Sequence, residues 1–533
     1  MKDIKENNVD YYFKRIFNWF TFDRRLAFFV TFICGMLLHF NQYSQLLLTT
    51  DAIGLGASGY NLSIWLIRIG RWLMGLLAPI LKLGINSILF NTIIVFITQG
   101  IISIHLNEIL KIKSKVLIVL NSLILVGIPY ITNVMLFQVY EFNIAFLFSI
   151  LSAKYLYKNT KKDYIIGSVF LILTLGIYQS DIAVTLTLIV YQYFMDYMIR
   201  NEKLKDIFLK LINVMSIFII SIVIYYIISQ VFLIVFNVTS ADYGGFSKIG
   251  TNIIESLPFR IKKCYLDFYQ YFIFSGNKEN YTLNLINNQY YHLNIVNIIM
   301  FALFFINMIL ILSKKKQSDL KLIVLMIFLL ILPILLNIIE LAMDIYFKFN
   351  ITMSAMYVLP ILFYSSTIEH IVENKCLNNK TIKRIYIYVE IFVLVFISYV
   401  YAYMGDATYI SIKKNYSNFY NTFYSVIERI EEDKDYVKGM PVYFAGVDSL
   451  DWESNLEIYT ISNLNRIGVV GTVSEAVLPT FLKEEFNFEY KIVNENELIN
   501  NLEFQQMKKW PDKNSIKVIN DIMVVKFSDL YVK

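Results

Sequence analysis

The sequence has little charge for its length. Only 17% of its 533 residues are Asp, Glu, Lys or Arg, whereas 57% are hydrophobic and the mean hydropathy is +0.53. A soluble protein of this size needs a far more polar surface. The hydrophobic residues fall in runs of about 20, the length that crosses a bilayer core about 30 Å thick. The composition therefore excludes a soluble protein and predicts an all-α polytopic membrane protein.

Cysteine is scarce as well, with three residues in the whole chain. Cys34 falls in the first hydrophobic segment, Cys264 in a long loop, and Cys376 in a loop rich in Lys and Asn. The topology derived below places them in three different compartments, where no two thiols can be bridged. Disulfides are therefore not expected in this fold.

Several motifs of known chemistry are missing. There is no GxxxxGK[ST] loop, which argues against ATP-driven work in this chain. There is no HExxH or CxxC pattern and no GxSxG elbow, so we expect no metal ligands and no cofactor, and nothing supports a divalent cation. A cytosolic nucleotide sugar would need a soluble cytoplasmic domain, and none is present. This favours a lipid-linked donor on the outer side, and no nucleic acid is expected as a partner.

Eleven hydrophobic segments qualify as spans. Residues 164–199 are too long for one span, so we expect a hairpin that turns near Ser180. The predicted spans are 26–48, 86–108, 116–136, 138–157, 164–180, 182–199, 211–236, 292–312, 321–341, 353–372 and 385–405.

The loops between these spans alternate in positive charge. The short loops near residues 137 and 181 carry no Lys or Arg. The positive-inside rule therefore places the basic loops and the aromatic, basic, amphipathic segment 1–25 in the cytoplasm. An odd number of spans then places the C-terminus outside. The basic loops contain Lys111, Lys113, Lys115, Lys158, Lys161, Lys162, Arg200, Lys203, Lys205, Lys314, Lys315, Lys316, Lys380, Lys383 and Arg384.

Two kinds of region follow from this topology. Residues 26–405 form the membrane part, with an outer segment at 49–85 and an outer loop at 237–291. Residues 406–533 are charged and are expected to form a small extracytoplasmic α/β domain, whose role the sequence leaves open. There, Pro441–Gly446 is typical of a strand, and Ser515–Phe527 of a hairpin that turns at Asn520–Asp521.

The stretch Thr49–Leu77 holds the strongest candidates for a site. Asp51 follows the first span, and a Gly-rich turn comes next. We then expect a helical segment that places Arg68 and Arg71 one turn apart, beside Trp65 and Trp72. A carboxylate and two guanidiniums at the membrane surface suit an anionic lipid-linked substrate.

Two more acids are predicted on the same face. Glu141 opens the fourth span and Asp181 lies at the outer turn of the hairpin, so both could join Asp51 and the arginines in one cavity. The alternative is that Asp51 is a helix-end residue in the headgroup zone and that the other two acids are solvated loop-end charges. The arginines would then reach lipid phosphates, and the tryptophans would anchor the interface. Further candidates near a sugar are Tyr140, Tyr178 and Gln179. His105, in mid-span, is expected to be a packed histidine.

The stretch Thr49–Leu77, with DAIG, GY and the residues Trp65, Gly70, Arg71 and Trp72, resembles the bacterial glucosyl transferase GtrII family. The segments VYEFNIAFLFSILSAKYLY at 139–157 and IYQSDIA at 177–183 resemble it in order and spacing. The similarity extends over the membrane part to about residue 405. Many members have paired acids after the first span, whereas Thr50 precedes Asp51 here, which weakens any metal-binding version of the site.

The resemblance implies a GT-C type glycosyltransferase. It implies an inverting transfer of a hexose, glucose foremost, from a polyprenyl phosphate to a surface glycan outside a bacterial plasma membrane. The implied partners are membrane lipid, a donor-synthesising glycosyltransferase and a flippase. Asp51 would be the base, and Arg71 with Arg68 would hold the lipid phosphate. The residues left for sugar or acceptor hydroxyls are Glu141, Asp181, Tyr140, Tyr178, Gln179 and Trp72.

Three other functions stay open. A lipid-linked oligosaccharide flippase or transporter predicts paired broken helices and charges at mid-depth, whereas these charges lie at the outer edge. An O-antigen-type polymerase commonly has an Arg-rich outer loop, and Arg260, Lys262 and Lys263 lie in the 237–291 loop. A membrane scaffold that presents residues 406–533 is the third alternative.

Overall fold

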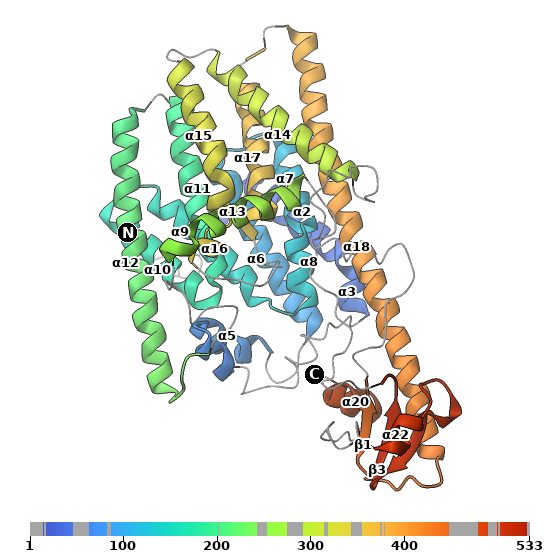
Figure 1. Ribbon diagram of the computed structural model, residues 1–533. Helices are drawn as coiled ribbons and strands as arrows, with labels where there is room; N and C mark the ends of the chain where they lie inside the picture. The colour runs from blue at the N-terminus through green and yellow to red at the C-terminus, as the bar shows by residue number, and fades with distance from the viewer. Residues whose placement is uncertain are drawn as a thin grey trace, which may run out of the picture. The chain divides into compact units, whose positions relative to one another are not determined.

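The computed structural model describes residues 14, 17–45, 63–82, 87–200, 202–241, 253–273, 291–313, 318–342, 354–373, 376–377, 379–446, 478–488, 498 and 501–529. The chain divides into two compact units, residues 1–44 with 60–406, and residues 45–59 with 407–533. The described part of the first unit is helical, as predicted for the membrane part (Figure 1).

Each predicted span overlaps at least one helix of the first unit, and the last of these helices continues past residue 406 into the second unit. The helices are α2 (Phe22–Leu38), α3 (Phe40–Ser44), α5 (Trp72–Lys82), α6 (Ile88–Ile109), α7 (Lys115–Gly127), α8 (Pro129–Leu136), α9 (Glu141–Leu156), α10 (Lys161–Ile177), η1 (Gln179–Asp181), α11 (Ile182–Met195), the π-helical η2 (Asp196–Arg200), α12 (Leu204–Val235), α13 (Ile253–Phe272), α14 (Tyr291–Leu312), α15 (Ser318–Leu336), α16 (Ile339–Ala342), α17 (Ser354–Glu373) and α18 (Lys380–Glu432).

Seven helices in the described residues are long and apolar enough to cross a membrane, or eight if a bent pair is one span. The predicted count of eleven therefore stays a prediction. Three of the remaining predicted spans, α2, α9 and α10, have 17, 16 and 17 residues, fewer than the about 20 that a perpendicular span needs. The predicted hairpin at 164–199 is confirmed, since η1 lies between α10 and α11.

Proline accounts for the bent pair. Pro129 is the first residue of α8, and Ile128 before it has an extended backbone. A residue that precedes proline is disfavoured in the helical conformation, so α7 ends there. The two helices meet at 40°.

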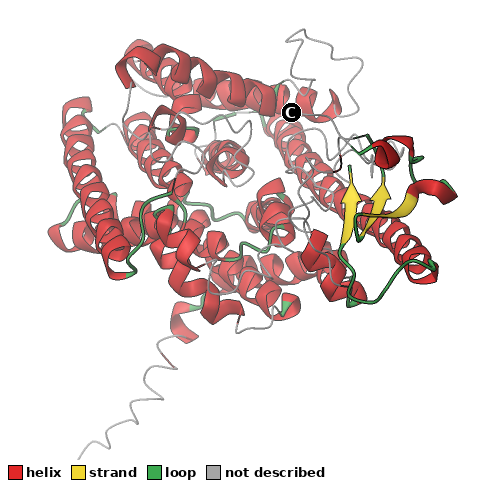
Figure 2. Cartoon of the chain, turned by 60° about the horizontal axis from the view of Figure 1, so that its bottom comes forward, coloured by secondary structure: helices red, strands yellow, loops and turns green. Residues whose placement is uncertain are grey.

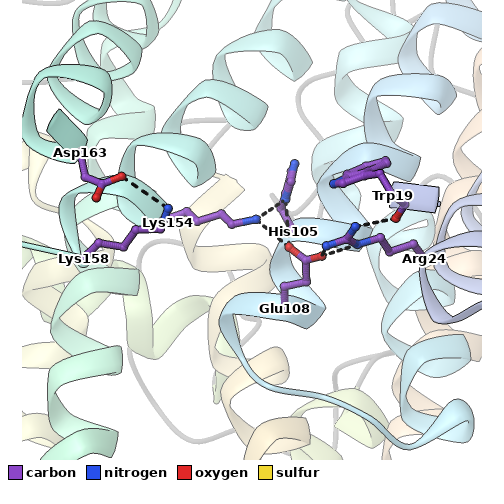
Figure 3. Close-up of polar contacts among 7 residues, drawn as sticks. All are labelled: Trp19, Arg24, His105, Glu108, Lys154, Lys158 and Asp163. Atoms are coloured by element: carbon purple, nitrogen blue, oxygen red, sulfur yellow. Dashed lines mark hydrogen bonds and ion pairs between the residues drawn. The ribbon is translucent and has the colours of Figure 1, made fainter. Parts of the chain in front are cut away.

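An ion-pair network joins α2, α6 and α9 at the ends that we predicted to be cytoplasmic (Figure 3). Glu108 accepts hydrogen bonds from Arg24 and Lys154, each at 2.6 Å, and the two cations approach it from opposite sides. His105 lies 3.4 Å from Glu108 and 3.0 Å from Lys154. His105 is thus a half-buried member of a polar cluster close to the end of α6, so its predicted mid-span position is wrong.

The second unit contains all the described strands (Figure 2). Strand β3 (Ile522–Lys526) is central, pairing parallel with β1 (Val442–Ala445) and antiparallel with β2 (Ile516–Ile519). Asn520 and Asp521 have positive φ, as the tight turn requires, so the predicted hairpin is confirmed. The other elements are α20 (Leu478–Phe486), α22 (Leu502–Gln506) and η5 (Lys513–Ser515).

The core of this unit forms where α18 and α20 pack on the sheet. Phe423 from α18 and Phe481 from α20 pack with Phe444 of β1 and Val525 of β3, and all four are buried. A helix and a sheet thus bury their apolar faces against each other. The extracytoplasmic position and the role of residues 406–533 stay predictions.

Candidate functional site

The outer segment is interrupted between its two arginines. Residues 63–68 are helical, and the helix ends where Gly70 takes a φ of 77°. The Gly70 amide donates to Ile67 O at 3.0 Å and the Arg71 amide to Leu66 O at 2.8 Å, the pattern of a Schellman motif. The predicted single helical segment is therefore wrong, because glycine permits the left-handed conformation that ends a helix.

This break separates the roles of the two arginines. Arg68 is the last helical residue before it, and its Nε donates to Thr239 O at 3.0 Å. The Ala241 amide donates back to Arg68 O at 3.0 Å. Arg68 therefore holds the segment after α12 against the helix end, and phosphate binding by Arg68 stays a prediction.

Arg71 lies against two aromatic rings. Its guanidinium carbon is 5.4 Å from the centre of the Phe142 ring and 5.1 Å from that of Tyr178. The two rings stack at 4.0 Å, which joins the start of α9 to the turn after α10. Three segments that are distant in the sequence thus meet around one half-buried cation.

Gln179 forms hydrogen bonds to the Arg71 side chain and to the backbone just before it. The Gln179 Oε1 atom accepts from Arg71 Nε at 3.4 Å. Its Nε2 donates to Ile69 O at 3.2 Å and to the Tyr225 hydroxyl at 3.0 Å. Tyr225, on α12, donates in turn to Gly70 O at 3.1 Å. The amide that we predicted near a sugar is therefore bonded to the arginine and to its backbone.

Trp72 is a buried residue of the same junction. Its ring stacks on Phe232 of α12 at 5.2 Å and lies over Gly176 of α10. A Cβ at position 176 would be 2.7 Å from the indole, so only glycine leaves room for it. The indole N–H is buried with no partner among the described residues, and such a donor is where a ligand or water would bind. Sugar binding by Trp72 stays a prediction.

The predicted acids are buried beside this junction. Glu141 is 0% exposed and Asp181 is 1% exposed, so the alternative that they are solvated loop ends is wrong. Each lies within three residues of a stacked ring, Phe142 or Tyr178. Tyr140 is also buried, and its hydroxyl has no partner in the part of the chain that the structure describes. Asp51 lies outside the described residues.

The cations of the second outer loop form a separate cluster. Lys263 on α13 contacts Glu340 of α16 at 2.6 Å and Asp267 at 3.3 Å, and Arg260 donates to Leu341 O at 2.9 Å. Burial would lower the pKa of Lys263, but the ion pairs with Glu340 and Asp267 outweigh burial and raise it. These cations hold α13 to α16, across the direction of the long helices (Figure 1).

Sequence reasoning missed Phe142, Tyr225 and Phe232. Tyr225 carried a signal, because Ser221, Tyr225 and Ser229 recur every fourth residue of α12 and all three are buried. A polar stripe on an otherwise apolar helix marks the side that faces protein. No group of three or more His, Cys, Asp and Glu that could hold a metal occurs within the described ranges.

The comparison with known protein families finds a match that covers the region around Arg71. Residues 47–365, which include the whole Arg71 junction, match the family model described as Glucosyl transferase GtrII. Comparisons with curated proteins and with solved structures find no match.

Proposed function

The chain belongs to the glucosyl transferase GtrII family, and from this premise we propose that it moves a hexose, glucose foremost, from a polyprenyl phosphate to a surface glycan. Transfer takes place at the outer face of a bacterial plasma membrane. The observation that carries the proposal is the position of Arg71. A guanidinium held at the junction of α5, α9 and the turn at η1 suits a phosphate, which it binds through paired N–H donors.

The reaction needs a base and a stabilised leaving group. In our proposal Asp51 takes the proton from an acceptor hydroxyl, whose oxygen forms a bond to the anomeric carbon. The bond from that carbon to the phosphate oxygen breaks, and the lipid phosphate leaves with the electron pair. Arg71 stabilises the charge that develops on it, and one displacement inverts the anomeric centre.

The buried acids suit the sugar. Carboxylates accept hydrogen bonds from hydroxyl groups, and in this proposal Glu141 and Asp181 bind hydroxyls of the hexose or acceptor. The rival functions draw less support. The family is one of glucosyl transferases, and Arg260 and Lys263, which left a polymerase open, are bonded to α16.

Arg71 gives the direct test. Arg71→Ala should lower transfer from a synthetic polyprenyl-phosphate glucose by about 10- to 150-fold, the value of one charge-assisted contact. Arg71→Lys should recover part of it, because an ammonium lacks the planar fork. Lys262→Ala, which removes an exposed cation from α13, is the control. Full activity of Arg71→Ala would remove Arg71 from the site.

The biological readout is a glycan comparison. A strain that lacks the protein should lose one hexose branch from a surface glycan, and the wild-type gene should restore it. An unchanged glycan profile together with altered export of lipid-linked oligosaccharide would favour the transporter.

A further inference from the structure

The backbone around Arg71 has an unusual set of side-chain contacts. The helix break leaves the carbonyls of Ile69 and Gly70 without the partners that a continuing helix would supply. Gln179 Nε2 donates to the first carbonyl at 3.2 Å, and the Tyr225 hydroxyl donates to the second at 3.1 Å. Gln179 also donates to Tyr225, at 3.0 Å. Three successive residues, 69 to 71, are therefore held by one Gln–Tyr pair.

The hydrogen-bond directions in this pair are determined by chemistry. A carbonyl can only accept, so the Gln179 nitrogen must face Ile69 O, and the amide oxygen then faces Arg71 Nε. Both amide donors of Gln179 are thereby used, one on Ile69 O and one on Tyr225. Gln179 therefore has no amide donor left for a sugar, and sugar binding through its amide oxygen stays a prediction.

We propose that Gln179 and Tyr225 are positioning residues that orient the Arg71 guanidinium toward a lipid phosphate. This inference rests on the proposed function, since it takes phosphate as the ligand of Arg71. The pair acts on Arg71 in two ways: Gln179 holds the side chain through Nε, and both residues hold the carbonyls just before it. The arrangement orders a long, flexible side chain before the ligand arrives, which lowers the cost of binding.

The helix that carries Tyr225 supplies a matched control. Tyr225 is 7% exposed, whereas its neighbour Tyr226 is 60% exposed. Tyr225→Phe and Tyr226→Phe each remove one hydroxyl from the same helix, and only the first affects the Arg71 backbone. A second variant, Gln179→Glu, puts a carboxylate beside Arg71 and removes the donor to Ile69 O.

The experiment measures binding of farnesyl phosphate and of farnesol, which lacks the phosphate, to the purified full-length protein in detergent. Tyr225→Phe should weaken binding of farnesyl phosphate about 3- to 10-fold, as expected for lost neutral hydrogen bonds, and leave farnesol unchanged. Gln179→Glu should weaken the binding of farnesyl phosphate more strongly, again with the binding of farnesol unchanged. Tyr226→Phe should bind both ligands as wild type, and all variants should unfold near the wild-type temperature.

The outcomes separate the two proposals. If Arg71→Ala weakens the binding of farnesyl phosphate while Tyr225→Phe and Gln179→Glu do not, the positioning role is wrong and the proposed function stands. If Arg71→Ala binds farnesyl phosphate as wild type does, the phosphate role of Arg71 is wrong. Equal weakening of both ligands in Tyr225→Phe and Gln179→Glu would show a general structural role and overturn the inference.

Discussion

At the scale of single residues, the sequence named candidate side chains, and the structure shows contacts of theirs that the sequence did not predict. Arg71 and Tyr178 were predicted for separate roles, in phosphate and in sugar binding, and the structure places the guanidinium carbon 5.1 Å from the centre of the Tyr178 ring. The contacts of Gln179 were not predictable, since they depend on carbonyls that a helix break exposes and on a tyrosine 46 positions away. Pattern reasoning sees residue types, whereas hydrogen-bond partners depend on the tertiary fold.

Asp51 is the sharpest residue to change. Asp51→Asn keeps the shape of the side chain and removes its basicity, so transfer should fall about 10²- to 10⁴-fold. The variant should fold, insert and bind farnesyl phosphate as wild type does. Transfer within about threefold of wild type would place the base elsewhere, with Glu141 or Asp181 as the next candidates.

Cys264 should be chemically inert. Burial raises the pKa of its thiol to about 12, with the nearby carboxylates of Glu340 and Asp267 acting in the same direction. Since the thiolate is the reactive form, and little of the thiol is ionised at pH 8, labelling of native Cys264 should be very slow. A protein with Cys264 as its only cysteine should resist a maleimide until it is denatured. Adding Lys262→Cys, an exposed neighbour, is the positive control, and rapid labelling of native Cys264 would contradict the expected burial.

At the scale of elements, the hydrophobic pattern predicted continuous helices at two places where a glycine or a proline breaks the helix. The apolar period around Arg68 and Arg71 continues through Gly70, so it predicted one helix. The positive φ of Gly70 ends that helix instead. In the same way Pro129 divides a predicted span into α7 and α8. Hydrophobic periodicity indicates which face of a helix is buried. It does not indicate where the helix ends, because a single glycine or proline can end it.

Gly70→Ala tests the importance of this break. Alanine in the left-handed region costs about 1–2 kcal/mol, so the free energy of unfolding should fall by that amount. Farnesyl phosphate should bind more weakly, because Arg71 follows directly. Gly439 also has a positive φ, 91°, and belongs to the second unit, so Gly439→Ala should cost similar stability without affecting ligand binding. Equal ligand binding by both variants would show that the break does not position Arg71.

At the scale of the whole molecule, composition predicted the helical membrane character, and family membership agrees with the resemblance. The end of α18 could not be predicted from the hydrophobic pattern. The predicted span ends at residue 405, yet the helix continues to Glu432. Charged residues such as Lys413 and Lys414 end an apolar run without ending a helix, because Lys is a good helix former.

Topology is the prediction at this scale. A phosphatase reporter fused at the C-terminus should be active, as expected outside the cytoplasm, and one inserted at 158–162 should be inactive. The reason is the alternation of Lys and Arg between loops. An active reporter at 158–162 would reverse the orientation and move the Arg71 junction to the cytoplasmic side.

The shape of α12 has a consequence for the lipid environment. Its 32 residues are about 48 Å long, more than the about 30 Å of a bilayer core, and most of its apolar residues are not buried against the protein. A helix that is too long for its membrane tilts, and the tilt changes with bilayer thickness. Tyr225 is one of the few buried residues of α12, so a change in the tilt of this helix should move Tyr225 relative to Arg71. Bilayer thickness should therefore affect ligand binding at the site. Farnesyl phosphate affinity should change with the acyl-chain length of reconstituted vesicles in wild type, and Tyr225→Phe should flatten that dependence.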